Sequence, residues 1–253
     1  MNQSQTPLEL VNFGSRAAFF QDVTDHLQQK RGFTVATLNL DHIVKMRQDP
    51  AFAAAYRQHS HVVADGNPIV WLSRLGGREV DLIPGSELIA PLVALAADLN
   101  VPIAMLGATE ETLAITTEKL QERHPQLQVA AKIAPPYRFD PDGEAAADAL
   151  RQIDQSGAGL CFLALGAPKQ ERLAARAAQL APHCGFVSIG AGLDFIAGHQ
   201  TRAPIWARKI AMEWLWRMLS NPRRLAWRYA QCFAILPSLL IAARRMKRTG
   251  RNS

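Results

Sequence analysis

The stretch "GLCFLALGAPKQERLAARAAQLAPHCGFVSIGAG", residues 159–192, decides the fold class of this chain. Its apolar runs at 159–168 and 185–192 predict two strands that are buried on both faces. Between them, the segment from Pro168 to Leu180 predicts a helix, because proline is well suited to a helix start. A helix that joins two fully buried strands is typical of a parallel sheet, so the stretch predicts an α/β fold.

The same alternation continues toward the N-terminus. Four more apolar runs, at 33–40, 60–66, 101–108 and 127–136, predict strands that are also buried on both faces. Helix signals lie between several of them, from Ser15 to about Gln29, Ser86 to Asn100, Thr109 to His124, and Gly143 to Ser156. We therefore expect a Rossmann-like, mainly parallel sheet with helices on both faces.

The net charge divides the chain at about residue 200. Residues 1–200 contain 16 Lys and Arg against 21 Asp and Glu, a balance of −5, whereas residues 201–253 contain 12 against the single acid Glu213, a balance of +11. The second part has no strand candidate and predicts helices, with a break at 220–222 after which Pro222 starts the next helix. We expect a sheet domain over 1–200 and a basic, tryptophan-rich helical appendage over 201–253. Such an appendage suits an anionic surface, either phospholipid headgroups or nucleic acid.

Cysteine content and the opening residues indicate the compartment. The three cysteines, Cys161, Cys184 and Cys232, are far apart and flanked by apolar residues, so we expect reduced core thiols. The opening "MNQSQTPLEL" has no basic region followed by an apolar run, and we expect no secretory signal. Both features predict a cytoplasmic protein.

Three predicted strands end in small residues and glycine, which marks a candidate phosphate site. Gly107, Gly166 and Gly190 follow such strands in "LGA", "LGAPKQE" and "IGAGLDF". In an open parallel sheet, ligands lie beyond the carboxyl ends of the strands, where backbone N–H groups and helix N-termini hold phosphate. We expect a nucleotide-sized site there, with Lys169 and Gln170 projecting into it. The alternative for Lys169 is a solvated helix residue.

Polar residues at two other strand ends are candidates for the chemistry. Asp65, in "VVADGNPIVW", is placed to act as a general base, or to cap the helix that opens near Pro68. Thr37 and Asn39, two residues apart in "TLNLDH", share one face of a strand end. They bind either sugar hydroxyls or a neighbouring loop. We expect Asp41 to cap the following helix.

The remaining motifs predict neither a dinucleotide nor a metal. The stretch "IGAGLDFIAG" lacks the third glycine of a dinucleotide fingerprint and lies at the last strand, although Asp194 can bind a ribose or serve as a cap. Asp140 and Asp142 have the D-x-D spacing of many metal-dependent sugar-nucleotide enzymes, but proline stands between them in a polar loop. The histidines show no ligand spacing, so we predict no metal.

Several of these motifs together resemble one protein family. The segments "TLNLDHIV", "VVADGNPIVW", "IPGSEL", "LGA", "LGAPKQE", "GAGLDFIAG" and "RAPIWARKIAMEWLWRMLSNPRRLAWRY" follow the order and approximate spacing of the WecG/TagA/CpsF glycosyltransferases, glycosyltransferase family 26. The resemblance runs from about residue 10 to 230. It implies an inverting, metal-independent, cofactor-free transfer from a UDP-sugar to a polyprenyl-diphosphate-linked sugar, for cell-surface polysaccharide. It also implies a peripheral location on the cytoplasmic face of the bacterial inner membrane.

The resemblance implies roles for particular residues. By that likeness Asp65 is the candidate base, with Thr37 and Asn39 beside it. Gln170 and Arg78 would lie near the reacting sugars, although Arg74 is an equal candidate for the second of these positions. Residues implied to hold UDP are the glycine strand ends, Tyr137 and Asp194.

The appendage has two interpretations. Trp206, Ile210 and Trp214 fall at four-residue steps on one helical stripe, and arginines follow at 217, 223, 224 and 228. Tryptophan favours the headgroup boundary, and Arg217, Arg223, Arg224 or Arg228 would bind lipid or UDP diphosphate. The apolar run in "CFAILPSLLIAARRMKR", about 12 residues, is shorter than the roughly 20 needed to span a bilayer, so we expect it at the interface. Alternatively, the tryptophans are core between tail helices and the arginines a solvated face.

The expected partners are therefore a UDP-sugar donor, a lipid-linked acceptor sugar and an anionic membrane surface, and not nucleic acid. The donor is of the N-acetylmannosamine, N-acetylmannosaminuronate or glucose type. Two other classes are weighed against this function: a nucleotide-binding oxidoreductase and a nucleic-acid-binding module that uses the basic tail. The sequence does not name the donor or acceptor, and it leaves homo-oligomerisation open.

Overall fold

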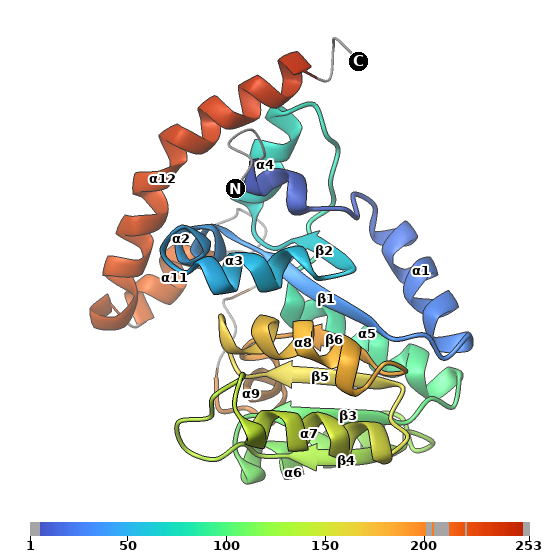
Figure 1. Ribbon diagram of the computed structural model, residues 1–253. Helices are drawn as coiled ribbons and strands as arrows, with labels where there is room; N and C mark the ends of the chain where they lie inside the picture. The colour runs from blue at the N-terminus through green and yellow to red at the C-terminus, as the bar shows by residue number, and fades with distance from the viewer. Residues whose placement is uncertain (1–5, 201–203, 205–212, 221, 250–253) are drawn as a thin grey trace.

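The computed structural model describes residues 6–200, 204, 213–220 and 222–249 (Figure 1). Its centre is a six-stranded sheet in the order β2-β1-β6-β5-β3-β4, and all neighbouring strands are parallel. The strands are β1 (Phe33–Leu38), β2 (His61–Ala64), β3 (Ile103–Gly107), β4 (Val129–Ile133), β5 (Leu160–Ala164) and β6 (Gly185–Ser188). Each lies within a run that the sequence predicts, which confirms the α/β fold.

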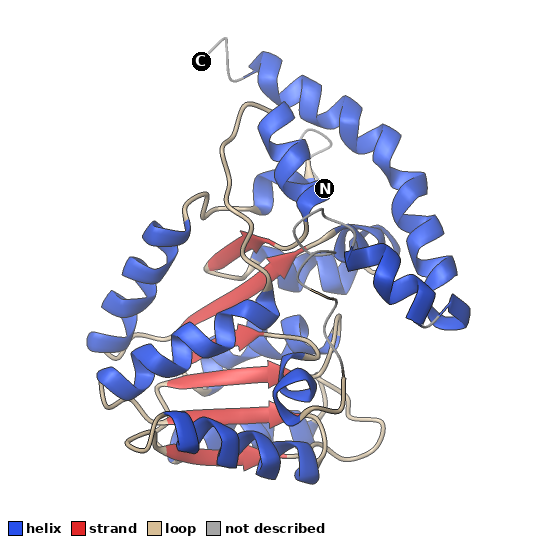
Figure 2. Ribbon diagram, turned by 180° about the vertical axis from the view of Figure 1, so that it is seen from behind, coloured by secondary structure: helices blue, strands red, loops and turns tan. Residues whose placement is uncertain are grey.

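Helices cover both faces of the sheet, as expected (Figure 2). On one face lie α1 (Arg16–Gln28), α5 (Gly85–Asp98), α6 (Glu110–Arg123) and α9 (Gly192–Ala197), and on the other α7 (Glu144–Gln155) and α8 (Lys169–Leu180). Successive strand residues supply the two faces in turn: Met105 and Phe162 pack in the first core, Leu106 and Leu163 in the second. This two-sided burial explains the unbroken apolar runs.

The strand β4 departs from the prediction of complete burial. It is the outermost strand and pairs only with β3. Within it Ala131 is buried, whereas Ala130 and Lys132 are exposed. An edge strand is flanked by fewer elements, and a lysine there is typical of an edge that resists further pairing.

The helix starts agree with the sequence at two caps and differ at a third. Ser15 Oγ accepts the N–H of Ala18 (3.4 Å), and Thr109 Oγ1 accepts the N–H of Thr112 (3.1 Å), as expected of N-caps. Helix α5, however, begins at Gly85 rather than being capped by Ser86. A Cβ at position 85 would lie only 3.0 Å from the carbonyl oxygen of Ser188, so this helix start is packed closely against the end of β6.

A third group of elements surrounds the β2 side of the sheet. It comprises the 3-10 helix η1 (Pro7–Leu10), α2 (Leu40–Gln48), α3 (Pro50–Arg57), α4 (Asn67–Leu75), α11 (Glu213–Ser220) and α12 (Pro222–Thr249). Helix α12 packs against α2 and α4, and Leu239 and Ala243 on it are buried in the same core as Leu72. The break between α11 and α12 falls where Pro222 predicts it. Both helices lie on the side toward which β3 and β5 point, whereas α1 lies on the opposite side (Figure 1).

Helix α12 is longer than the apolar run seen in the sequence. Its segment Leu225–Arg248, 24 residues, is long and apolar enough to cross a membrane by length and composition alone. The run of about 12 residues is extended on its N-terminal side by Leu225, Trp227 and Tyr229. Arg228 and Ser238 on the same helix nevertheless bond to α2, and Cys232 is buried.

The cysteines are as predicted. Cys161, Cys184 and Cys232 are all free and buried. Burial raises the pKa of the Cys161 thiol above its usual value. These thiols are therefore packing groups rather than nucleophiles.

Candidate functional site

The carboxyl ends of the strands meet along one edge of the sheet. Because the strands are parallel, the residues that follow β1, β2, β5 and β6 lie at the same edge; these are Asn39, Asp65, Gly166 and Gly190. From the adjacent strands β3 and β5 the chain leaves in opposite directions, to β4 and to β6. Ligands of open α/β sheets bind at such a switch point, so the fold places a crevice here.

Asp65 lies at the rim of this edge. Its backbone N–H donates to the carbonyl oxygen of Leu38 (2.7 Å), and its side chain is partly exposed. Gly66 follows with φ +100° and occupies the N-cap position of α4, so Asp65 is not the cap that one interpretation of the sequence assigned. The carboxylate also helps to raise the pKa of the buried Tyr56, after burial itself and Glu171.

Thr37 and Asn39 lie beside Asp65 on the neighbouring strand β1. Thr37 is buried, with its hydroxyl facing the start of α5 at Gly85. Asn39 Oδ1 accepts the N–H of His42 (3.0 Å), so Asn39 is the N-cap of α2. The sequence assigned this cap to Asp41, which is wrong because the helix starts two residues earlier, at Leu40.

Gln170 is buried rather than projecting into the crevice. Its side chain is 2% exposed. Its Nε2 donates to Glu171 Oε1 (2.8 Å), and its Oε1 accepts the N–H of Gly190 (3.1 Å). The carboxamide thereby joins the loop after β6 to the first turn of α8, below the Gly166 loop. Lys169, beside it, is partly exposed.

Glu171 is a site residue that the sequence analysis missed. It is fully buried, and its Oε2 atom has no hydrogen-bond partner among the described residues. Burial raises the pKa of its carboxyl to about 7. One feature of the sequence could have indicated its burial. Glu171 lies at the edge of the buried stripe of α8, which is formed by Gln170, Leu173, Ala174 and Ala177 at helical spacing.

Two further buried groups lie next to this carboxyl. The hydroxyl of Tyr56 hydrogen-bonds to Nδ1 of His42 (3.1 Å). Burial lowers the pKa of His42 to about 3, so its ring is neutral at neutral pH. Burial, together with Glu171 and Asp65, raises the pKa of Tyr56, which therefore stays protonated. The interior below the rim consequently carries little charge.

A chain of charges ties the appendage to this edge. Arg228 Nε on α12 pairs with Asp41 Oδ1 (2.7 Å), and Lys45 Nζ pairs with Asp41 Oδ2 (2.9 Å). Lys45 also donates to the carbonyl oxygen of Ala167 (2.9 Å), in the loop after β5. Burial alone would raise the pKa of Asp41, but Arg228 and Lys45 outweigh it and the pKa is lowered. Helix α12 is therefore connected through α2 to the glycine-rich loop.

The three glycines that the sequence assigns to UDP differ in their surroundings. Gly166 (φ +71°) and Gly190 (φ +56°) have left-handed backbones, and a Cβ at either would meet no atom within 4 Å. They therefore face open space. A Cβ at Gly107 would lie 2.4 Å from the carbonyl oxygen of Ala164, so this glycine allows β3 and β5 to approach closely.

The other proposed substrate contacts are spread around this edge and beyond it. Tyr137 is 92% exposed in the loop after β4, with the guanidinium of Arg138 over its ring. Asp194 lies in the first turn of α9 and accepts from Gln200 Nε2 (3.2 Å). The guanidinium of Arg78 donates to the carbonyl oxygens of Leu8 and Val11. The alternative, Arg74, pairs with Glu79 at the surface.

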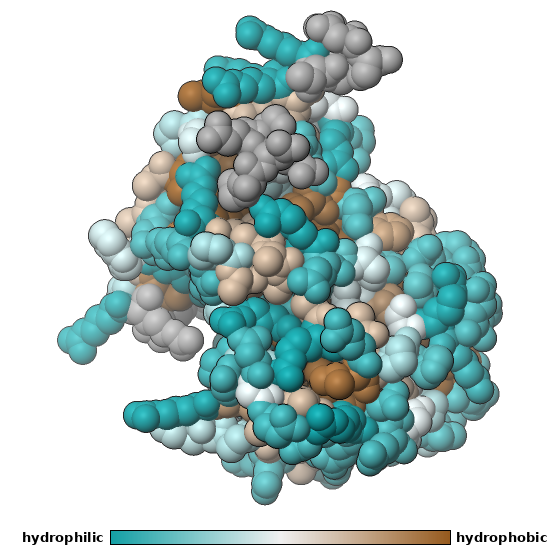
Figure 3. Space-filling model, viewed as in Figure 1, coloured by the Kyte–Doolittle hydropathy of each residue, from teal (hydrophilic) through white to brown (hydrophobic). Residues whose placement is uncertain are grey.

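The appendage combines packed and exposed aromatic residues. Trp214 packs against Tyr229 and Phe233 of α12, with ring centroids 5.8 and 5.3 Å apart, as the core interpretation expects. In contrast, Trp227 is 73% exposed, and exposed apolar residues also occur at Trp216, Leu219, Phe233, Leu240 and Ile241. Arg223 is exposed. The side chains of Arg217 and Arg224, and residues Trp206 and Ile210, lie outside the described part of the chain. Figure 3 shows apolar patches beside extended hydrophilic side chains in the upper part of the molecule, where α12 lies.

The D-x-D pair is engaged in contacts with α8 and within its own loop. Asp142 pairs with Arg172, and Asp140 Oδ1 accepts the N–H of Asp142 (3.0 Å). A pocket of about 180 Å³ lies at the opposite, amino-terminal edge of the sheet, lined by Thr34, Ser60 and Pro182 among others. The open glycines and Asp65 lie instead at the carboxyl edge.

Comparison with known families agrees with the motifs at this edge. The model of the glycosyl transferase WecG/TagA/CpsF family matches residues 7–252, nearly the whole chain. The matched range includes the sheet, Asp65 and the described part of the appendage.

Proposed function

Because the chain belongs to the glycosyl transferase WecG/TagA/CpsF family, we propose that it transfers a sugar from a UDP-sugar to a polyprenyl-diphosphate-linked sugar. The family makes the chain a glycosyltransferase with a sugar donor and a sugar acceptor. The proposal adds the nucleotide, the lipid carrier, inversion at the anomeric carbon, independence from a catalytic metal, and a role in cell-surface polysaccharide synthesis. One observation supports it most: Asp65 lies at the carboxyl edge of the sheet, the same edge as the open Gly166 and Gly190 loops.

In the proposed reaction Asp65 is the general base. Its carboxylate accepts the proton of the acceptor hydroxyl while that oxygen bonds to the anomeric carbon on the face opposite UDP. The bond from that carbon to the UDP oxygen breaks, and UDP leaves with the electron pair. Attack from the opposite face gives a β-linkage from an α-donor. Thr37 and Asn39, on the adjacent strand end, would orient the acceptor sugar.

The donor is proposed to lie over the glycine loops. Gly166 and Gly190 have no side chain that would exclude the diphosphate, and Lys169, at the first residue of α8, supplies a cation. Tyr137 offers an exposed ring for the uracil, and Asp194 accepts from the ribose hydroxyls. Gln170 acts by holding the Gly190 loop, because its carboxamide is already bound there.

The appendage is proposed to bring this edge to the membrane. Its exposed aromatic and aliphatic residues suit the headgroup boundary, and each nearby basic residue adds about 1 kcal/mol at an anionic surface. The contacts of α12 with α2 and α4 support peripheral docking in preference to a span. Arg217, Arg223 and Arg224 would neutralise diphosphate charge, whereas Arg228 is already paired with Asp41. We accordingly divide the chain into a catalytic domain, 1–200, and a membrane-association appendage, 201–253.

A donor screen tests the proposed function. The full chain would be incubated with UDP-N-acetylmannosamine, UDP-N-acetylmannosaminuronate or UDP-glucose and a synthetic lipid-diphosphate sugar, and the lipid product read by mass spectrometry. One donor should add one sugar mass in the presence of EDTA, with release of UDP. Transfer from a nucleotide other than UDP, or only with added divalent metal, would contradict the proposal.

A further inference from the structure

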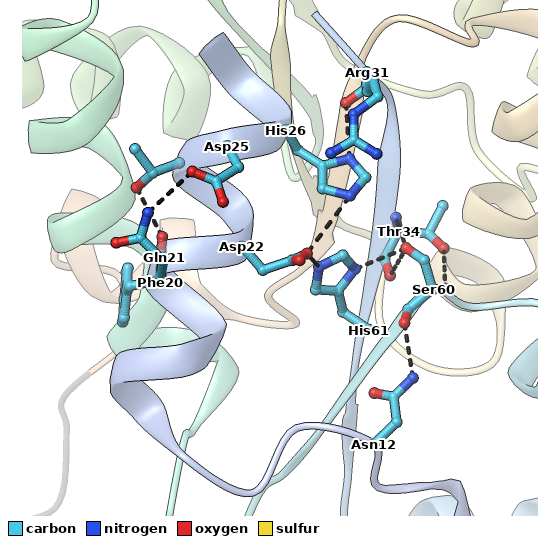
Figure 4. Close-up of polar contacts among 11 residues, drawn as sticks. Asn12, Phe20, Gln21, Asp22, Asp25, His26, Arg31, Thr34, Ser60 and His61 are labelled. Carbon is cyan, nitrogen blue, oxygen red and sulfur yellow. Dashed lines mark hydrogen bonds and ion pairs between the residues drawn. The ribbon is translucent and has the colours of Figure 1, made fainter. Parts of the chain in front are cut away.

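A group of metal-ligating side chains lies at the edge of the sheet opposite the proposed reaction site. Asp22 and His26 project from α1, one turn apart, toward His61, the first residue of β2 (Figure 4). Asp65 follows the other end of this four-residue strand, roughly 13 Å away at about 3.3 Å per residue. The group is therefore separate from the chemistry proposed for Asp65.

The three side chains place their ligand atoms around one point. Asp22 Oδ2 lies 2.7 Å from His61 Nε2 and 3.5 Å from His26 Nε2, and all three atoms lie within 4.8 Å of one another. Ligands at about 2.1 Å from a tetrahedral Zn²⁺ are roughly 3.4 Å apart. The observed separations bracket this value. An outward movement of the Asp22 carboxylate, which is 42% exposed, by about 0.7 Å would bring the closest pair to it.

Hydrogen bonds on the far side of each ring hold both Nε2 atoms toward the carboxylate. His26 Nδ1 lies 3.2 Å from the carbonyl oxygen of Arg31, which accepts only, so Nδ1 carries the hydrogen. His61 Nδ1 lies 2.8 Å from Ser60 Oγ. The same hydroxyl lies 3.2 Å from the carbonyl oxygen of Thr34, so the Ser60 side chain holds the His61 ring in its orientation. Such outer partners are typical of metal-bound histidines.

The arrangement suits a bound cation. With its hydrogen on Nδ1, the neutral His26 ring directs a lone pair at the Asp22 carboxylate, an unfavourable contact that a proton or a metal ion would relieve. The His61 ring is 2% exposed and stacks on Phe13, with centroids 4.6 Å apart and an interplanar angle of 1°. Low exposure disfavours an imidazolium, whereas a metal ion uses the neutral ring directly. His26, 16% exposed, and Asp22 leave the group open to solvent on one side.

We propose that Asp22, His26 and His61 bind one Zn²⁺ ion, with solvent as the fourth ligand, and that the ion fastens α1 to β2. Two imidazoles and one carboxylate are a donor set suited to Zn²⁺ among the common divalent ions. No ligand spacing is visible in the sequence, because the ligands come from a helix turn and from a strand that starts 35 residues after His26. The ion would stabilise the fold without taking part in transfer.

Equilibrium dialysis against Zn²⁺, on tag-free full-length protein stripped with EDTA, tests the site. The wild type should bind one equivalent and gain thermal stability with Zn²⁺, and bound Co²⁺ should give visible absorption bands of a tetrahedral site. Asp22→Asn and His26→Ala should each weaken Zn²⁺ binding at least tenfold. Both positions are partly exposed, which favours folded variants, and melting without metal checks this.

Matched controls distinguish this site from adventitious binding. Asp25→Asn, on the same helix, and His124→Ala, at the end of α6, should bind Zn²⁺ like the wild type. The proposal is overturned if the wild type binds no stoichiometric Zn²⁺. It is also overturned if Asp22→Asn and His26→Ala bind as the controls do.

Discussion

Replacement of Glu171 by glutamine probes the interior below the proposed reaction edge. The carboxyl of Glu171 is fully buried, and one of its oxygens has no hydrogen-bond partner among the described residues. The groups around it are Lys45 and Asp41 from α2, Tyr56 from α3 and Gln170. Glutamine keeps the size of the side chain and an acceptor for Gln170, but it does not titrate.

The expected magnitude follows from the pKa of Glu171. Its pKa is about 7 in the folded protein, against an ordinary value of 4.5. Between these values the folded protein retains a proton that the unfolded chain has released, so stability falls as the pH rises through this window. The total loss from this group is about 3 kcal/mol, complete above pH 7.

Two buried histidines act in the opposite direction. Burial lowers the pKa of His42 to about 3 and that of His59 to about 4, against 6.5 for the ordinary side chain. Their unfolded forms bind protons that the folded protein does not, so these groups add stability as the pH rises toward 6.5. Subtracting wild type from the Glu171→Gln variant cancels both contributions. The difference in unfolding free energy should then rise by about 3 kcal/mol between pH 4.5 and 7.

Urea denaturation at half-unit steps from pH 4.5 to 8, followed by circular dichroism, measures this difference. Glu122→Gln, at an exposed position of α6, is the matched control and should show a flat difference profile. A Glu171→Gln difference profile that is flat within about 0.5 kcal/mol would refute the assignment of a buried, protonated carboxyl.

Three further predictions concern the glycine loops and the appendage. In a thermal melt, Gly107→Ala should lower the melting temperature more than Gly166→Ala does. The new Cβ at position 107 would lie 2.4 Å from the carbonyl oxygen of Ala164. At Gly166 a new Cβ would meet no atom, and the cost is backbone strain of about 1–2 kcal/mol. Arg228→Ala should speed limited proteolysis of α12, since the variant loses its ion pair to α2; cleavage at the wild-type rate would show that the pair does not hold this helix. Trp227→Ser should reduce cosedimentation of the protein with anionic vesicles. The control Trp71→Ser, which replaces another exposed tryptophan on α4, should not reduce it. Equal losses in the two variants would argue against docking through the appendage.

Most of the fold was predictable because the sheet is buried on both faces. The runs at 159–168 and 185–192 locate β5 and β6 correctly, and β4, with exposed Lys132, departs most from full burial. Helix ends were harder to predict, since a residue is an N-cap only if its side chain is oriented to accept a backbone N–H of the first helical turn. Asn39 rather than Asp41 caps α2 for this reason.

The candidate site was predictable in its position but not in its interior. Strand ends and glycines mark the edge, so Asp65, Gly166 and Gly190 could be found from the sequence. The Asp22 group could not, because proximity across 35 residues or more depends on tertiary packing. The ion pair between Asp41 and Arg228, which lie 187 positions apart, could not be predicted for the same reason. For Glu171 the only signal was its place beside the apolar stripe of α8.

The role of Asp65 is tested most directly by the turnover of Asp65→Asn, once the donor is known. Asparagine keeps the shape of the side chain but cannot accept the hydroxyl proton. Loss of a general base typically lowers kcat by 10²–10⁴-fold. We predict a fall in that range with the affinity for UDP, measured by calorimetry, unchanged within about threefold, since Asp65 is not placed against the nucleotide. Near-normal turnover by the variant would contradict the account.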